Sequence, residues 1–250
     1  MKKQLYTLLG AKTFSDFGFA FDFICFSLFI WTHTQSAWAT GCLSAAFYSG
    51  GILGGKAAHQ WGDRWDRRKA MMGADLLRSF ALICLLGLPL EQQLVFIYPV
   101  IFLIGVGRAV FESSLAASLP AMAGDKLQWV NSLISGMKST ALVLGMLFAA
   151  IAIEILGYRF LFFLDALTYA LSALVLLRVC LPFHETTTVE REKGMGVSAK
   201  KIPLLKHLGL IILLLIFVRV LDAFGSGTHH IGLPMLGTML NAKNPGSIMG

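Results

Sequence analysis

Among the ionisable residues inside long apolar stretches of the sequence, where an unpaired charge is costly, three are the candidates for binding a ligand or a proton. Asp22 stands in the middle of the stretch 14–31, and no cation lies within one helical turn of it. Arg108 and Glu112 are four residues apart in the stretch 94–115, a spacing that places both on one face of a helix. A buried carboxylate can bind a proton or another cation, and an arginine can bind that carboxylate or an anionic group of a ligand. The alternative interpretation is structural: Asp22 pairs with an arginine of a neighbouring helix, and Arg108 pairs with Glu112.

The stretches that carry these residues belong to a set of seven, each close to the roughly 20 residues that a helix needs to cross a bilayer. The seven occupy residues 14–31, 38–55, 70–88, 94–115, 132–156, 160–180 and 208–224. Because they are apolar all round rather than at alternate positions, they indicate helices and not strands. The expected fold class is therefore an all-α membrane protein, built as a helical bundle.

The composition supports a membrane protein and argues against several other classes. Hydrophobic residues make up 56% of the 250 residues, only 14% are charged, and the mean hydropathy is +0.70. Soluble domains carry about 25% charged residues, so a soluble enzyme, a nucleic-acid-binding domain and a disordered chain are not expected. The four cysteines form no CxxC pair, and His229 and His230 would diverge by about 100° on a helix. Neither a metal nor another cofactor is expected.

The basic residues fall on one side of the predicted bundle and account for the net charge of +7. Three precede the first span, Lys12 among them, five follow the second, one follows the fourth and six surround the loop after the sixth. The opposite side carries only Arg159 and Lys243. Since basic loops stay in the cytoplasm, the N-terminus is predicted to be cytoplasmic, and nucleic acid is not needed to explain the charge.

A polar segment divides the chain. Residues 181–207, between the sixth and seventh spans, are rich in charged and hydroxyl side chains and are predicted to be a cytoplasmic linker. Residues 1–180 are then an N-terminal six-helix bundle. Residues 208–250 hold the first helix of a second unit and a turn-like tail, so we expect the chain to be truncated, with the rest of that unit missing.

The loop between the second and third spans carries the most specific motif. It reads His-Gln-Trp-Gly-Asp-Arg-Trp-Asp-Arg-Arg-Lys over residues 59–69. This segment resembles motif A of the major facilitator superfamily, Gly-x-x-x-Asp-Arg-x-Gly-Arg-Arg, which lies in the same loop. The residues that match are Asp63, Arg64, Arg67 and Arg68, whereas His59 and Asp66 replace the two glycines.

Shorter pieces extend the resemblance along the chain. They are Asp75-Leu-Leu-Arg78, Leu119-Pro120, Val130-Asn-Ser-Leu133 and Phe163-Leu-Asp-Ala166. Together they look like the branch that contains macrolide-efflux and enterobactin-exporter-type proteins. The antiporter motif of the fifth helix, Gly-Pro-x-x-Gly-Gly, is represented only by Gly145. The family has twelve helices in two halves, so the resemblance implies about seven of twelve here.

The resemblance implies a secondary active transporter of a bacterial-type inner membrane, not an enzyme. It would export a small molecule, either a drug or a siderophore-like compound, by alternating access and antiport with protons. Its partners would be the lipid bilayer, the substrate, protons and a missing C-terminal half. Asp22 or Glu112 would carry the protons in a cavity that also holds Arg108. The alternatives are a non-transporting fragment, or a half-transporter or scaffold from a truncated gene.

The motif implies a cytoplasmic gate. Asp63, with Arg67 and Asp75, would hold the two halves together on the inside in the outward-open state. Arg64, Arg68 and Arg78 belong to the same set of gate residues. Outside this set, Asp165 is expected to lie near the outer turn with Arg159 and to contact water.

Overall fold

The computed structural model describes residues 2–62, 66–178 and 214. The chain divides into two units, Met1–Pro182 and Phe183–Gly250, and the described helices belong to the first. Of the second unit only Leu214 is described, and it is helical and exposed. The expected linker at 181–207 lies outside the described residues, as does the rest of the expected span at 208–224.

All regular structure in the described part of the chain is helical. The elements are α1 (Lys2–Thr34), α2 (Ala37–Trp61), α3 (Arg67–Leu86), α4 (Leu90–Ala123), the short 3₁₀ helix η1 (Gly124–Lys126) and α5 (Leu127–Leu176). An all-α protein was expected, and the described residues agree with that expectation.

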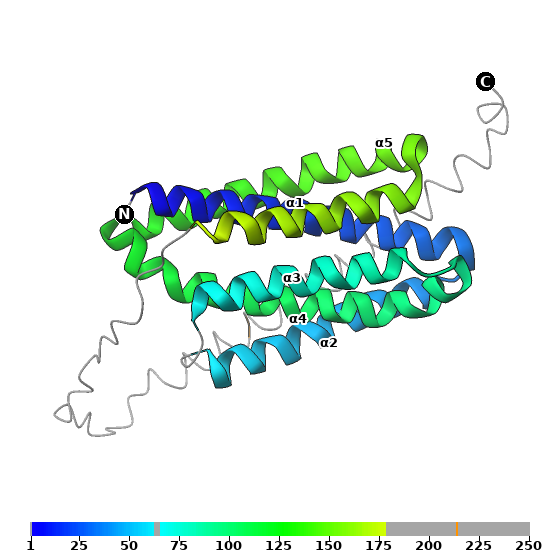
Figure 1. Cartoon of the computed structure of the whole chain (residues 1–250), viewed down its shortest axis with the longest axis horizontal. Helices are drawn as coiled ribbons and strands as arrows, with labels where there is room; N and C mark the ends of the chain where they lie inside the picture. The colour runs from blue at the N-terminus through cyan, green and yellow to red at the C-terminus, as the bar shows by residue number, and fades with distance from the viewer. Residues whose placement is uncertain (1, 63–65, 179–213, 215–250) are drawn as a thin grey trace. The chain divides into compact units, whose positions relative to one another are not determined.

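Helix α5 consists of two arms that fold back on each other at Gly157, as Figure 1 shows. Gly157 has φ 76° and ψ 169°, a backbone conformation that side-chain-bearing residues rarely adopt. The expected spans 132–156 and 160–180 correspond to these two arms. The connection between them is therefore a single glycine bend.

Local sequence signals explain where the other helices begin and end. The Ser36 side chain accepts a hydrogen bond from the Ala39 amide at the start of α2. The Asp66 carboxylate accepts bonds from the amides of Arg68 and Lys69 at the start of α3. Asp66 replaces a glycine of the motif, and in this structure it serves as a helix cap.

Three stretches of the described helices are apolar and long enough to cross a membrane: Gln4–Thr34, Leu90–Ala149 and Ile151–Leu176. The predicted count of seven transmembrane helices is therefore not confirmed. Helix α2 has 25 residues and α3 has 20, which suffices in length. However, α2 is rich in small and hydroxyl residues, and α3 carries Asp75 and Arg78 within its apolar run.

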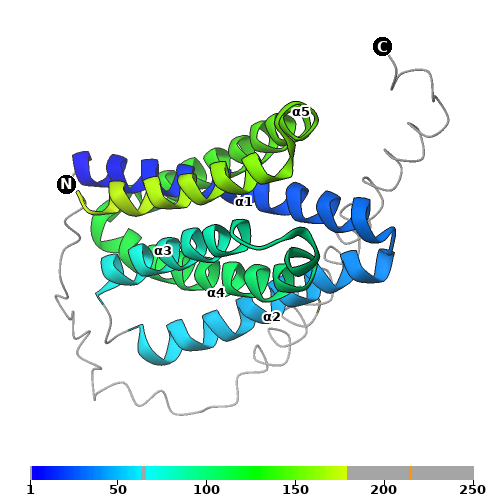
Figure 2. The same ribbon diagram turned by 45° about the vertical axis from the view of Figure 1, so that its right-hand side comes forward.

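The helices pack side by side as a bundle. Helix α1 packs mainly against α5, α2 against α4, and α3 against both α4 and α5. Figures 1 and 2 show α3 between α5 on one side and α4 on the other. This arrangement surrounds α3 with neighbours and explains why its Asp75 and Arg78 are buried.

The buried interior has two apolar clusters with a polar layer between them. One cluster includes Phe26, Leu82, Ile104 and Phe162. The other includes Leu8, Met71, Leu115 and Val130. Between them along the helices lie residues 12–22 of α1, 75–79 of α3, 108–112 of α4 and 165–172 of α5, which include most of the buried polar side chains. We call this region the polar layer.

Candidate functional site

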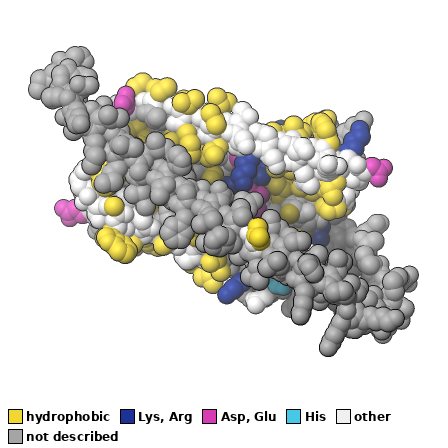
Figure 3. Space-filling view, turned by 180° about the vertical axis from the view of Figure 1, so that it is seen from behind, with side chains coloured by type: hydrophobic (Ala, Val, Ile, Leu, Met, Phe, Trp, Pro, Cys, Tyr) yellow, Lys and Arg dark blue, Asp and Glu magenta, His cyan; other side chains and the backbone are white. Residues whose placement is uncertain are grey.

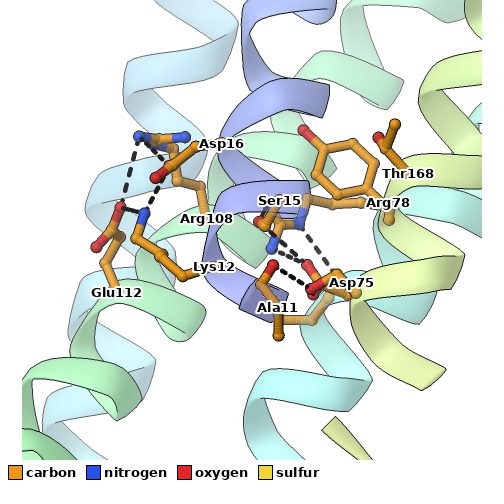
Figure 4. A network of polar contacts seen from close by, with 12 residues as sticks. Ala11, Lys12, Ser15, Asp16, Asp75, Arg78, Arg108, Glu112 and Thr168 are labelled. Atoms are coloured by element: carbon orange, nitrogen blue, oxygen red, sulfur yellow. Dashed lines mark hydrogen bonds and ion pairs between the residues drawn. The ribbon is translucent and has the colours of Figure 1, made fainter. Parts of the chain in front are cut away.

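Four charged side chains close a ring between α1 and α4, and we call it the ion cluster: Lys12, Asp16, Arg108 and Glu112. Lys12 Nζ lies 2.6 Å from Asp16 Oδ1 and 2.7 Å from Glu112 Oε1. Arg108 Nη2 lies 3.7 Å from Asp16 Oδ1 and 3.5 Å from Glu112 Oε1. Each helix contributes one cation and one carboxylate four residues apart, so the ring is neutral and its charges alternate. Figure 4 shows this ring on one side of α1.

The ion cluster is buried except at one corner. The side chains of Lys12 and Asp16 are 4% and 3% exposed, whereas that of Glu112 is 37% exposed. Arg108 lies over the Phe19 ring, with Cζ 3.6 Å from the ring centroid. Figure 3 shows that basic and acidic side chains reach the surface together in the middle of one face, between hydrophobic side chains.

A second set of polar contacts lies on the other side of α1 and is built around α3 (Figure 4). We call it the arginine network: Ser15, Asp75, Arg78 and Ser172. Arg78 forms an ion pair with Asp75 and donates to Ser15 Oγ at 3.2 Å. Ser172 Oγ lies 2.5 Å from Asp75 Oδ2 and 2.9 Å from the carbonyl oxygen of Ala11. The network therefore joins three helices through one buried ion pair.

The third part of the polar layer is a pair of carboxyl groups between α1 and α5, those of Asp22 and Asp165. Tyr169 donates its hydroxyl hydrogen to Asp22 Oδ2 at 2.5 Å. Asp165 is 1% exposed, so the prediction that it contacts water near the outer turn is wrong. The aromatic ring of Tyr169 also faces Arg78, whose Cζ lies 4.4 Å from the ring centroid.

The close approach of α1 and α5 at this point depends on Gly18. A Cβ atom added to Gly18 would lie 2.5 Å from Thr168 Oγ1 and 2.8 Å from Asp165 Oδ1. Both distances are shorter than real Cβ contacts, so any larger residue would push the helices apart or displace Asp165. The sequence thus provides the space that brings Asp165 next to Asp22.

Asp22 also borders a small cavity between α1, α2 and α4. Its other lining residues include Phe19, Leu43, Ser44 and Ile101. The volume of about 20 Å³ is enough for about one water molecule. A wider groove of about 450 Å³ lies between α1 and the first arm of α5.

The motif A residues divide into separate groups. Asp63 and Arg64 lie outside the described residues. Arg67 Nη1 donates to the carbonyl oxygen of Ala117 in α4 at 2.6 Å, and Arg68 donates to the carbonyl oxygen of Leu177 at the end of α5. Asp75 and Arg78 belong instead to the arginine network, deeper in the bundle. Arg67 therefore contacts α4, whereas Asp75 contacts Arg78 and Ser172, and no contact between Arg67 and Asp75 occurs among the described ones.

The three cavity residues that the sequence singles out are only partly brought together. Arg108 and Glu112 pair as their spacing predicts. Asp22 lies apart from them in the carboxyl pair, although Arg108 is close enough to attract its charge. No group of three or more histidine, cysteine or acidic side chains that could hold a metal occurs among the described residues.

Several residues of the polar layer were not singled out as site residues from the sequence. They are Lys12, Ser15, Asp16, Asp165, Tyr169 and Ser172. Lys12 was counted with the basic residues that flank the first span, but α1 begins at Lys2 and Lys12 is buried in it. The signal available was the four-residue spacing of Lys12 and Asp16, which matches that of Arg108 and Glu112.

A comparison with protein families agrees with this architecture. The model of the Major Facilitator Superfamily matches residues 6–250, nearly the whole chain. No curated protein gives a significant match. The family match, the helical bundle and the charged layer inside it lead to one conclusion: the chain belongs to the major facilitator superfamily.

Proposed function

We propose that the protein exports a small molecule across a bacterial-type inner membrane in exchange for protons. Membership of the family supports a multi-pass membrane transporter rather than an enzyme. The export direction of transport, its coupling to protons and the cytoplasmic position of the N-terminus are our proposal. The basic loops support the orientation, and the resemblance to macrolide-efflux and enterobactin-exporter-type proteins supports the direction.

The observation that carries the proposal is the exposed corner of the ion cluster. Lys12 holds both a buried carboxylate, Asp16, and the partly exposed Glu112. A proton that binds Glu112 removes its negative charge and breaks its ion pairs with Lys12 of α1 and with Arg108 of the same helix. The strength of the contact between α1 and α4 then depends in part on the protonation of one accessible group, since only the 3.7 Å contact of Arg108 with Asp16 remains between the helices in the ion cluster. Such a dependence allows protons to bias the two states of an alternating-access cycle.

The charge balance near Glu112 favours a substrate with an anionic group. Asp16 and Glu112 are already balanced by Lys12 and Arg108. Lys138, from the first arm of α5, interacts with the charges of Arg108 and Glu112 and adds a third cation. The surplus around the ion cluster is therefore positive. This favours an acidic, siderophore-like substrate over a cationic drug.

The wider groove provides a surface for the uncharged part of such a substrate. It is lined by Thr13 and Phe17 of α1 and by residues such as Met137, Thr140 and Leu144 of α5. Apolar and aromatic walls with a few hydroxyl groups are typical of small-molecule sites. We propose this groove as part of the substrate path.

We also propose that the loop between α2 and α3 works as the cytoplasmic gate. Arg67 and Arg68 tie the start of α3 to α4 and to the end of α5, and Asp66 caps the same helix end. These contacts support a fixed position for the start of α3, at which the loop ends. Asp63 would then act with Arg67 and Asp75 as a latch in the outward-open state.

Vesicle transport tests the proposal. The 250-residue chain is reconstituted into proteoliposomes, and the movement of a fluorescent anionic dye and a fluorescent cationic dye is followed under an imposed pH gradient. We expect gradient-driven movement of the anionic dye, and its loss in Glu112→Gln but not in Glu91→Gln, an exposed acid of α4. No movement by the wild-type chain would contradict transport by this chain alone and would favour a half-transporter that needs a partner.

A further inference from the structure

The carboxyl pair contains the least satisfied polar atoms of the described interior. Asp22 and Asp165 are 2% and 1% exposed. Asp22 Oδ1 and both carboxyl oxygens of Asp165 have no hydrogen-bond donor among the described residues. Buried polar atoms are nearly always paired, and each exception needs a physical reason. These three carboxyl oxygens therefore lack a hydrogen-bond donor.

The two carboxyl groups can supply that donor themselves. Gly18 and Asp22 are four residues apart on α1, and Asp165 and Tyr169 are four residues apart on α5. A Cβ atom on Gly18 would lie 2.8 Å from Asp165 Oδ1, and Tyr169 bonds to Asp22, so the two carboxyl groups face each other across the interface of the two helices. When both are ionised, every oxygen is an acceptor and the two negative charges repel each other. When one carries a proton, that O–H donates to the other group, and the repulsion disappears.

The charged groups around the pair do not neutralise it. Arg78 of α3 attracts both carboxyl groups but is already ion-paired with Asp75. Arg108 of α4 attracts Asp22 from a distance but belongs to the ion cluster. Tyr169 of α5 donates one hydrogen bond, to Asp22, and the Cys25 thiol of α1 lies nearby.

We propose that Asp22 and Asp165 form a binding site for a single proton, which the two groups share as an O–H···O hydrogen bond. Tyr169 orients Asp22 by donating to its other oxygen. Gly18 keeps the helices close enough for the shared bond. The proton enters as a hydronium ion and leaves to water, by way of the one-water cavity that Asp22 borders. No other bond forms or breaks.

The shared proton joins α1 to the second arm of α5. Its loss leaves two facing carboxylates without a donor, which drives the two helices apart at Gly18. Asp165 would thus be a further residue of proton coupling, beside Asp22 and Glu112. This role in coupling rests on the proposed function, whereas the proton site itself does not.

Infrared spectroscopy tests the site without any transport assay. The full chain in lipid vesicles is titrated at neutral pH and above, and the C=O stretch of a protonated carboxylic acid is followed in H₂O and in D₂O. We expect one deuterium-sensitive band at neutral pH in the wild type, lost reversibly at alkaline pH. The band should be absent in Asp165→Asn and in Asp22→Asn, because an asparagine amide replaces the shared proton as donor. The exposed acid Glu154 provides the control, and Glu154→Gln should keep the band.

A further variant keeps the test decisive if the asparagine variants do not insert. Tyr169→Phe keeps both carboxyl groups but removes the hydroxyl donor, so the band should persist at a shifted frequency. A wild type without the band, or a band of full intensity in Asp165→Asn, would overturn the proposal. A spectrum that lacks the band and instead changes when sodium is added would also overturn the proposal. It would indicate that the two carboxylates bind a metal cation and not a proton. Transport is measured separately, so an inactive protein with an intact band would reject only the proposed function.

Discussion

Lys12 of α1 lies 2.7 Å from Glu112 of α4, although the two residues are 100 positions apart in the sequence. The same amine lies 2.6 Å from Asp16. One side chain therefore neutralises a fully buried carboxylate and one at the surface. The ion cluster can lose one of these contacts, at Glu112, while the other keeps Lys12 in place.

Replacement of Lys12 tests the structural importance of this arrangement. Lys12→Met leaves Asp16 buried with only the 3.7 Å contact to Arg108. Breaking a buried ion pair from one side typically costs about 3–5 kcal/mol, so we expect a loss of about 3 kcal/mol in the free energy of unfolding. Thermal unfolding in detergent measures it. Lys56→Met, at an exposed position of α2, is the control and should change little.

Gly18 allows a test of the helix contact with a closely matched control. Gly18→Ala places a Cβ atom 2.8 Å from Asp165 Oδ1 and should destabilise the bundle by about 1–3 kcal/mol. Gly10→Ala lies on the same helix, where an added Cβ has no neighbour within 4 Å. We expect that variant to be neutral or slightly stabilising. Equal unfolding temperatures for the two variants would contradict the packing described here.

Ser172 provides a test of the arginine network. Its hydroxyl lies between Asp75 Oδ2 and the carbonyl oxygen of Ala11. Ser172→Ala removes a hydrogen bond to a buried carboxylate, which should cost about 1–3 kcal/mol in unfolding free energy. Ser49→Ala, at an exposed position of α2, should cost much less. Denaturant unfolding, followed by tryptophan fluorescence, measures the free energy of unfolding of both variants. Equal losses in the two variants would contradict a stabilising role of the network.

The gate proposal makes a prediction about activity rather than stability. Asp63→Asn should strongly reduce transport, because a latch with Arg67 and Asp75 requires the negative charge. Insertion into the membrane should be unchanged, and membrane fractionation with immunodetection measures it in the same cells. Asp66→Asn is a matched change three residues away that keeps a capping side chain. Unchanged export by Asp63→Asn would show that Asp63 does not act as a latch.

The helical bundle could be predicted from the sequence because long apolar runs and their boundaries are local signals. The break between 156 and 160 was expected, and Gly157 forms the bend there. The pair of Arg108 and Glu112 was also expected, since spacing on one helix determines it. The number of membrane-spanning helices is not confirmed, because α2 and α3 contain no stretch as long and apolar as those of the other described α-helices, and most of the expected seventh span lies outside the described residues.

The contacts between helices could not be predicted in the same way. Whether Lys12 meets Glu112 depends on how α1 and α4 are rotated against each other, and no local spacing specifies that rotation. Asp165 was placed near water because Arg159 and Glu154 are close in sequence. Its burial follows from the bend at Gly157 and the space at Gly18, which are properties of the packed structure.

In the proposed mechanism, protons drive transport through carboxyl groups of the polar layer. The most direct measurement places a pH indicator inside proteoliposomes that contain the chain and records proton movement when the anionic dye is added. We predict substrate-dependent proton movement in the wild type and none in the double variant Asp22→Asn with Glu112→Gln. Wild-type proton movement in that double variant would contradict the account.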